Sequence, residues 1–212
     1  IIAVGAYGND AGGSDAGHTS IFQYSNGSWS QLGSDIDGVN AGDYSGYSVS
    51  LSEDGTIVAI GEYGYDYNGT DSGITSIFQY SSGSWSQLGN SITGYSNGIG
   101  AYDYFGSAVS LSADGTIVAI GADGDDYGGN DSGSVSVYQY SNSSWSQLGL
   151  TIDGEAADDY SGSSVSLSDD GTILAIGAYG NDGRATEGGH TSIFQYSNGS
   201  WSQLGGDIDG VD

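Results

Sequence analysis

One unit of 56 to 60 residues is repeated along the 212-residue chain, and this repeat limits the possible folds more than any other feature. The unit is marked by four tryptophans at intervals of 56, 60 and 56 residues: Trp29, Trp85, Trp145 and Trp201. The four additional residues of the longer interval lie between Gly89 and Gly106. An insertion confined to one connection identifies that connection as a loop and its flanks as regular structure.

Each unit predicts four short strands. Small polar and apolar residues alternate in Ser-Val-Ser-Leu-Ser at 48–52 and its later copies, which is typical of a strand. The apolar segment 56–61 predicts a second strand that needs cover on both faces. After a polar loop of the kind found at 6–17, the segments 19–24 and 28–32 predict the third and fourth strands.

Two turn signals connect these strands into a meander. The pair Asp54-Gly55 follows the first strand, and Asn26-Gly27 follows the third. Both pairs accommodate the positive φ angles of a two-residue hairpin. We therefore expect two hairpins in series, and hence a four-stranded antiparallel sheet in each unit.

These sheets predict an all-β fold, a β-propeller of four-stranded antiparallel blades with about four blades covered. A sheet with apolar or aromatic side chains on both faces must stack on its neighbours, and radial stacking of four-stranded sheets gives a propeller. The alternative is an open β-repeat fibre. The chain is expected to form a single repeat domain, 1–212, with units 1–56, 57–116, 117–172 and 173–212, the last of them incomplete.

The two ends of the chain do not coincide with unit boundaries. Because the chain begins with Ile1, we expect a processed or incomplete product. The piece that would complete the count of units corresponds to positions 41–56. The chain could be part of a larger propeller or of a long repetitive protein. It could also have an open sheet edge that another molecule completes, since unpaired edges template strand addition.

The composition excludes several classes of function. Lys plus Arg number 1 and Asp plus Glu number 27, so the formal net charge is −26. Such a surface repels phosphate backbones and anionic headgroups, so we expect no nucleic-acid partner. No apolar run approaches the length of a membrane span, and we expect no membrane insertion in this segment. The absence of Cys excludes disulfides, thiolate zinc sites and cysteine nucleophiles.

The segment 103–122, Asp-Tyr-Phe-Gly-Ser-Ala-Val-Ser-Leu-Ser-Ala-Asp-Gly-Thr-Ile-Val-Ala-Ile-Gly-Ala, resembles an FG-GAP repeat. That family includes the β-propeller of integrin α chains. In two other copies Tyr-Ser-Gly replaces Tyr-Phe-Gly, and the Pro after Gly-Ala is always absent. The resemblance implies an extracellular propeller used for adhesion, recognition or scaffolding, commonly with seven blades.

Integrin-type FG-GAP repeats often carry a calcium loop between their first two strands. Here that connection is expected to be a two-residue hairpin with no room for an ion, so the family's metal site does not carry over. A different loop is rich in the oxygen ligands that calcium prefers, through Asp123, Asp125, Asp126 and Asp131. The simpler interpretation, which we favour, is that these acids solvate a Gly-rich loop and shape its turns. No cofactor is required, and calcium is the only one suggested.

Two further sets of residues lie on predicted turns and loops. Asn-x-Ser/Thr sequons, candidates for N-glycosylation in a secreted protein, occur at Asn26, Asn68, Asn130, Asn142 and Asn198. Loop tyrosines stand beside Asp and Asn, a combination that suits carbohydrate: Tyr7, Tyr63, Tyr65, Tyr67, Tyr127 and Tyr179. The simpler interpretation of these tyrosines is packing at blade ends or between subunits, and we prefer it.

No arrangement of residues predicts an enzyme. His18 and His190 occupy equivalent repeat positions, whereas a catalytic residue is normally unique in its fold. No nucleophile elbow, paired-histidine zinc motif or dinucleotide fingerprint is present. We therefore expect a non-enzymatic extracellular structural or scaffold protein, a component of a surface or extracellular fibre or other assembly, whose partners are further copies of itself or other extracellular proteins. The alternative is an adhesin or lectin-like propeller that binds carbohydrate or protein, with or without calcium.

Overall fold

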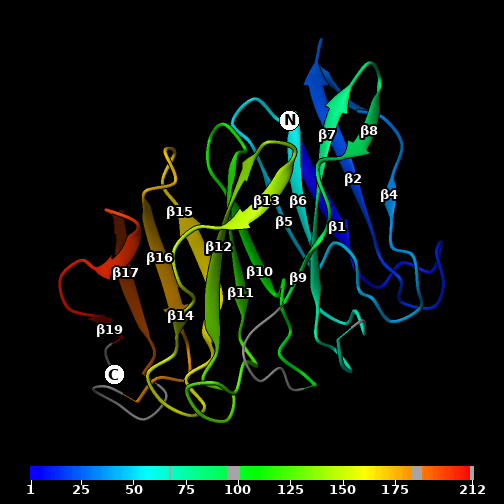
Figure 1. Ribbon diagram of the computed structural model, residues 1–212. Coiled ribbons are helices and arrows are strands. Elements are labelled where there is room, and N and C mark those ends of the chain that lie inside the picture. Colours follow the sequence, from blue (N-terminus) through cyan, green and yellow to red (C-terminus); the bar gives the residue numbers. More distant parts are fainter. Residues whose placement is uncertain (67, 95–100, 183–187, 211–212) are drawn as a thin grey trace.

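The computed structural model describes residues 1–66, 68–94, 101–182 and 188–210. All regular secondary structure within these residues is β-strand, and the strands form four antiparallel sheets. The sheets follow one another across the molecule in chain order, from β1 and β2 to β17 (Figure 1). None of the described residues forms a helix long and apolar enough to cross a membrane. The predicted all-β class is confirmed.

In the described part of the chain, nineteen strands make up the four sheets. The first sheet contains β1 (Ile2–Ala6), β2 (His18–Ser25), β3 (Ser28–Gln31) and β4 (Ile36–Asp37). The second contains β5 (Ser48–Leu51), β6 (Ile57–Glu62), β7 (Ile74–Ser81), β8 (Ser84–Gln87) and β9 (Ile92–Thr93). The third contains β10 (Ala108–Leu111), β11 (Ile117–Ala122), β12 (Ser134–Ser141), β13 (Ser144–Gln147) and β14 (Ile152–Asp153). The fourth contains β15 (Ser161–Leu167), β16 (Ile173–Ala178), β17 (His190–Ser197), β18 (Ser200–Gln203) and β19 (Ile208–Asp209).

The hairpin between the predicted third and fourth strands of each repeat unit has the predicted two-residue turn. In the first sheet, β2 ends at Ser25 and β3 begins at Ser28. Asn26 and Gly27 both have positive φ, 51° and 84°. This is the backbone conformation of the hairpin turns that match the twist of the flanking strands.

The connection between the first and second strands is longer than the two residues predicted from Asp54-Gly55. In the second sheet it spans five residues, 52–56. The Ser52 N–H still donates to the Ile57 carbonyl at 2.9 Å. Side chains add two more bonds, because the Ser52 hydroxyl accepts the Ile57 N–H at 2.9 Å and the Asp54 carboxylate accepts the Thr56 N–H at 2.9 Å. The extra length is therefore filled by the turn's own serine and aspartate.

The outer strand of each sheet is split in two, which the four-strand prediction missed. Both β3 and β4 pair with β2, and the equivalent pairs recur in the other three sheets. Gly33 separates the two pieces with φ 79°. A Cβ at Gly33 would lie 2.8 Å from Cδ1 of Trp85, so a side chain here would meet the next sheet.

Neighbouring sheets approach closely through glycine. A Cβ on Gly61 of β6 would lie 2.0 Å from the carbonyl oxygen of Gly106, which precedes β10. The equivalent contact joins Gly5 to Gly46 in the preceding junction. Only glycine therefore allows the second strand of one sheet to lie directly against the next sheet.

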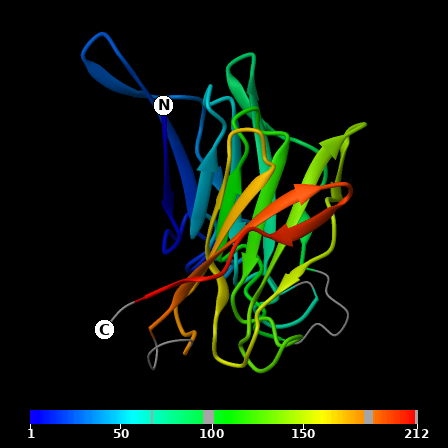
Figure 2. The ribbon, with the colours of Figure 1, turned by 90° about the vertical axis from the view of Figure 1, so that its left-hand side faces the viewer.

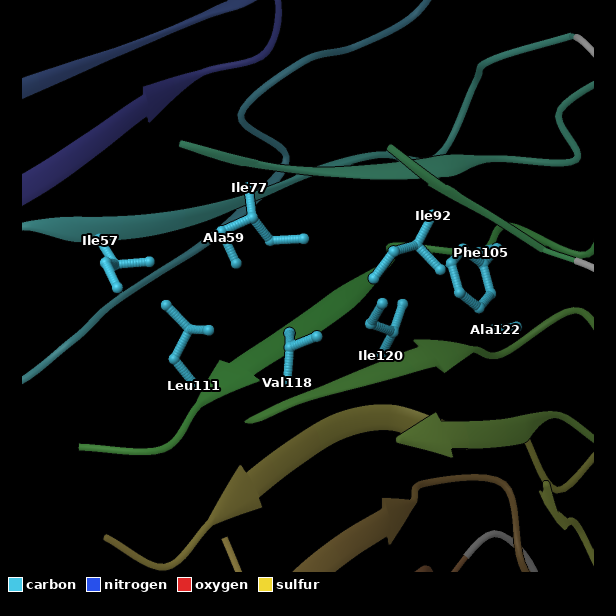
Figure 3. Close-up of a cluster of buried hydrophobic side chains, with 9 residues drawn as sticks. All are labelled: Ile57, Ala59, Ile77, Ile92, Phe105, Leu111, Val118, Ile120 and Ala122. Atoms are coloured by element: carbon cyan, nitrogen blue, oxygen red, sulfur yellow. The ribbon is translucent and has the colours of Figure 1, made fainter. Parts of the chain in front are cut away.

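The hydrophobic core lies between successive sheets rather than within one of them. In Figure 3, Ile57 and Ala59 of the second sheet face Val118 and Ile120 of the third. All six residues of β6 and all six of β11 are buried. The prediction that the second strand needs cover on both faces is confirmed in these two sheets.

The four sheets are the blades of a β-propeller. Their first strands β5, β10 and β15 lie against one another in order, and β1 lies against β5. The blades are out of phase with the sequence units, because each complete blade combines the first strand of one unit with the other strands of the next. The second, third and fourth blades thus span 48–93, 108–153 and 161–209.

Candidate functional site

A cavity of about 420 Å³ lies between the second and third blades. It sits where the chain enters β5 and β10 and leaves β6 and β11. Seven residues line it: Tyr44, Tyr47, Tyr63, Asp71, Tyr104, Ser107 and Asp123. Four aromatic rings, two carboxyl groups and one hydroxyl therefore surround a space of the size that small-molecule sites commonly have.

Two of the tyrosines are held in a left-handed backbone conformation. Tyr44 has φ 54° and Tyr104 has φ 56°. The Tyr44 N–H donates to the Asp15 carbonyl of the preceding blade, and the Tyr104 N–H donates to the Asp71 carbonyl, each at 3.1 Å. Such a conformation is uncommon for a bulky residue and persists only where the surroundings impose it. Backbone bonds between blades thus fix where these rings project.

Tyr63, which follows β6, is the central ring of the group. It stacks on Tyr44 with ring centroids 5.0 Å apart and an interplanar angle of 3°. Its edge contacts involve Tyr47 at 4.5 Å and Tyr104 at 5.6 Å. Stacked and edge-on pairs are the favoured arrangements of aromatic rings. The aromatic side of the cavity is therefore packed and ordered.

The electrostatic environment of the cavity is negative. Burial, together with Tyr44, Tyr47 and Asp71 nearby, raises the pKa of the Tyr63 hydroxyl to about 12. Burial is the main cause that raises the pKa of Asp71, and Asp66 adds to it. The described part of the chain contains no Lys or Arg, because the single arginine of the sequence, Arg184, lies outside it. No basic side chain of the described residues balances these groups.

The four acidic residues of the calcium prediction point to different places. Asp123 lines the tyrosine cavity. Asp125 is buried and accepts the Tyr127 N–H at 2.8 Å and the Ser134 hydroxyl at 3.0 Å. Asp126 accepts the N–H of Asp131 at 2.8 Å within the loop. The turn-shaping interpretation accounts for these bonds, and calcium binding stays a prediction.

A different group of metal-ligating side chains comes together between the third and fourth blades. The ligand atoms of Glu155, His190 and Asp207 all lie within 4.8 Å of one another. The Asp207 carboxylate already accepts hydrogen bonds from Ser192 and Gln203. Sequence reasoning missed this group because Glu155 belongs to the preceding blade. Nδ1 of His18, the repeat equivalent of His190, lies 3.9 Å from Oδ1 of Asp37.

The five sequons are exposed, as the sequence predicts. Three lie at the two-residue turn before the tryptophan strand, and two lie in loops after the second strand: Asn26, Asn142 and Asn198, then Asn68 and Asn130. The Asn130 side chain donates to Asp131 at 2.8 Å, and the Asn68 side chain donates to the Gly94 carbonyl at 3.2 Å. Glycosylation of these residues stays a prediction.

Each junction between blades is closed at its outer edge by a tryptophan. The indole Nε1 of Trp85 donates to the Leu32 carbonyl of the preceding blade at 2.7 Å. Trp145 and Trp201 make the same bond to the carbonyls of Leu88 and Leu148, each at 2.8 Å. The three junctions therefore share one geometry, in which a tryptophan covers the end of the previous blade's outer strand.

The outward faces of the first and fourth blades carry the two unpaired halves of this junction. On the first blade, Trp29 is 51% exposed, and Ile2 and Val4 of β1 are exposed beside it. On the fourth blade, which faces the viewer in Figure 2, Leu204 is 52% exposed and the space beside Gly205 is open. We call these surfaces the Trp29 face and the Leu204 face.

The loop tyrosines singled out in the sequence fall into two groups. Tyr63 lines the cavity, whereas Tyr127 is exposed. Tyr7 packs edge-on against Tyr47 at 5.5 Å, and Tyr179 stacks on Tyr160 at 4.8 Å. Tyr67 lies outside the described residues. The sequence reasoning missed Ser107 and three of the cavity tyrosines: Tyr44, Tyr47 and Tyr104. For Tyr44 and Tyr104 the available signal was a tyrosine two residues before a repeated glycine.

Comparison with known proteins identifies the repeat. The sequence profile described as "FG-GAP repeat" matches residues 96–138 and 145–194. These two segments therefore carry FG-GAP repeats, as the resemblance implied. A search of curated proteins finds no match.

Comparison with solved structures supports the fold. A chain of the nidogen/laminin complex aligns with 89% of this chain at a TM-score of 0.50 and 6% identity. A protein assigned as TolB from Agrobacterium tumefaciens aligns with 89% at a TM-score of 0.50 and 10% identity. This chain spans 58% and 55% of the lengths of those two chains. At such identities the similarity concerns the fold alone.

Proposed function

Because the chain carries FG-GAP repeats folded as propeller blades, we propose that it is a non-enzymatic structural protein of an extracellular or cell-surface assembly. The observation that carries this proposal is the pair of outward faces. The Trp29 face and the Leu204 face are the two halves of a junction that the molecule already forms three times internally.

The chemistry of the two faces favours association between copies. Trp29, Ile2 and Val4 are apolar and exposed on one face, and Leu204 and Ile208 are apolar and exposed on the other. Burying such surface drives protein association. A contact between two different faces is heterologous, so it produces a ring if the rotation closes and a filament if it does not.

The setting outside the cell is part of the same proposal. The five sequons are exposed, and a chain with 27 acidic residues and 1 basic residue suits a well-screened ionic exterior. Mutual repulsion among the acids opposes assembly at low ionic strength, because dissolved ions screen charges less when the salt concentration is low. Assembly is therefore expected to strengthen as salt is added.

Sedimentation velocity of the 212-residue chain over a range of concentrations tests the proposal. We expect species larger than a monomer, with Trp29→Ala and Leu204→Asp each shifting the chain to monomer. Each variant keeps one intact face, so a mixture of the two is expected to form dimers that grow no further. Tyr127→Ala removes an exposed aromatic residue away from both faces and serves as the control. A wild-type chain that stays monomeric at high concentration would overturn the proposal.

A second function, recognition of a ligand, is favoured by one specific observation. The cavity between the second and third blades brings four tyrosines together with two carboxyl groups. Binding of carbohydrate or protein by an adhesin-like propeller stays a prediction.

A further inference from the structure

We propose that the tyrosine-lined cavity between the second and third blades binds a small organic ammonium ion. The inference goes beyond the structural role proposed above and does not depend on it, because the cavity lies inside one chain and apart from the two outward faces. It is carried by a local departure from the repeat, by the geometry of the rings and by the charge of the lining.

The cavity occurs where the repeat changes. Position 63 is Tyr in the second blade, and its copy in the third blade is Asp123. Position 47 is Tyr only in the second blade, and its copies in the third and fourth blades are Ser107 and Ser163. In the second blade Tyr47 and Tyr63 pack against each other, and Tyr63 stacks on Tyr44. Two smaller residues at the next junction leave the space that these rings would occupy.

The rings that remain can hold a cation. A cation is attracted to an aromatic face when it lies within about 6 Å of the ring centroid. The centroids of Tyr63 and Tyr47 are 4.5 Å apart, and those of Tyr63 and Tyr104 are 5.6 Å apart. Because all four tyrosines line the same cavity, a small cation inside it can lie close to more than one ring.

The carboxyl groups add charge that the protein itself does not balance. Asp71 and Asp123 both line the cavity, and the Asp71 carboxylate accepts no hydrogen bond from another described residue. Burial raises the pKa of both carboxyl groups, since their charged forms lose water. A bound cation would stabilise these charged forms. An anion would be repelled.

The lining distinguishes an organic cation from other ligands. Asp71 and Asp123 do not belong to the one group of described residues whose ligand atoms converge for a metal ion. Four aromatic rings are poor metal ligands, whereas a substituted ammonium ion has an apolar surface that fits against them. A neutral sugar could stack on the same rings, but it would leave the two carboxyl groups without a counter-charge.

Calorimetric titration of the intact chain with choline tests the proposal. The control ligand is 3,3-dimethylbutan-1-ol, which has the shape of choline with a neutral carbon in place of nitrogen. We expect choline to bind with one site per chain and the neutral analogue to bind at least about tenfold more weakly. Equal binding of the two ligands, binding of methyl glycosides in place of choline, or no binding of choline would overturn it.

Variants that place the second-blade tyrosines at the equivalent third-blade positions test the location. Asp123→Tyr and Ser107→Tyr place side chains that the fold already accepts at positions 63 and 47, and each is expected to abolish choline binding. The melting temperature of each variant is measured alongside, so that loss of binding can be separated from loss of folding. Unchanged binding in both variants would place the ligand elsewhere and overturn the proposal.

A matched pair of charge variants completes the test. Asp15 is the repeat equivalent of Asp71 at the preceding junction, outside the cavity. We expect Asp71→Asn to weaken choline binding by about tenfold and Asp15→Asn to change it by less than about twofold, because only the first carboxyl group lies unscreened beside the cation. Equal effects of the two substitutions would show a response to net charge alone and would contradict the assignment.

Discussion

The second and third blades bury both of their faces, whereas the first and fourth blades bury only one. The same apolar pattern makes the second strand in all four. Every residue of β6 and β11 is buried, but β1 and β16 alternate between more and less exposed positions. Near-identical sequences thus have different environments, and the environment is set by how many neighbours a blade has.

This difference shows where the stability of the molecule originates. A repeat protein is stabilised by the intrinsic stability of each unit and by the interfaces between neighbours. Ile60 of β6 is completely buried, while Ile2 on the equivalent face of β1 is 42% exposed. Within this chain, the outward faces of the first and fourth blades therefore contribute less to folding than the faces between blades do.

The largest expected effect is the difference in the free energy of unfolding lost when Ile60 and Ile2 are each replaced by Ala. Ile60→Ala leaves a cavity between the first and second blades and is expected to lower the free energy of unfolding by about 3 kcal/mol. Ile2→Ala removes a side chain that water already reaches and is expected to lower it by less than about 1 kcal/mol. Urea denaturation at a concentration where the chain is monomeric measures both. Similar losses in the two variants would show that the blades do not differ as described.

The next effect is a pH dependence of stability, and it arises from a buried carboxyl group of the second blade. Glu62 of β6 is buried, and burial, with Asp43 nearby, raises the pKa of its carboxyl group from 4.5 to about 7. The folded state therefore binds the proton more tightly than the unfolded state does. The contribution of the Glu62 carboxyl group to the stability of the folded state is present below pH 4.5 and is lost as the pH rises to about 7.

Glu62→Gln removes this dependence, because the amide stays neutral. At pH 8 we expect the variant to be more stable than the wild type by up to about 3 kcal/mol, and at pH 4.5 the two should be similar. Asp103, whose pKa burial also raises to about 7, leaves part of the pH dependence in place. Thermal unfolding from pH 4.5 to 8 makes the measurement, with the exposed Glu53→Gln as control. A variant that is less stable at pH 8 would contradict the account.

The smallest expected effect is the difference between a tryptophan whose indole donates a hydrogen bond to the preceding blade and the copy in the first blade, which makes no such bond. Trp145→Phe removes the indole donor to Leu88 and is expected to lower the free energy of unfolding by about 1 kcal/mol or slightly more. Trp29→Phe removes no such bond and is expected to leave stability unchanged within about 0.5 kcal/mol. Denaturation followed by circular dichroism compares them. A loss at Trp29 as large as that at Trp145 would mean that Trp29 has a partner within its own blade that matters for folding.

The blade architecture could be predicted from sequence because the repeat supplied the same signal several times. Alternation at 48–52, a continuous apolar strand and the Asn26-Gly27 turn each have a local physical cause. The split outer strand was not predictable in the same way. Gly33 ends β3 because Trp85 of the next blade occupies the adjacent space, and that contact joins residues far apart in the chain.

The candidate site was only partly predictable for a similar reason. Tyr63 lies in a polar loop and was a candidate from the sequence. Tyr44 and Tyr104 belong to the segment that defines the repeat, and the sequence gives no sign that they do more than maintain the fold. Their role in the cavity depends on the backbone bonds that hold them and on the absence of rings at Ser107 and Asp123. A cavity formed by replacing large residues with small ones leaves no motif in the sequence.

The backbone bonds between blades have a mechanical consequence. At the second junction, three N–H groups within 102–105 donate to the carbonyls of 70–72 at 2.7, 3.1 and 3.2 Å. A force that slides one blade past the next loads these bonds together, so that none can break without the others sharing the load. The hairpin at 26–27, in contrast, can open one pair at a time. Under tension, a row of such blades would stretch little and then fail abruptly at a junction.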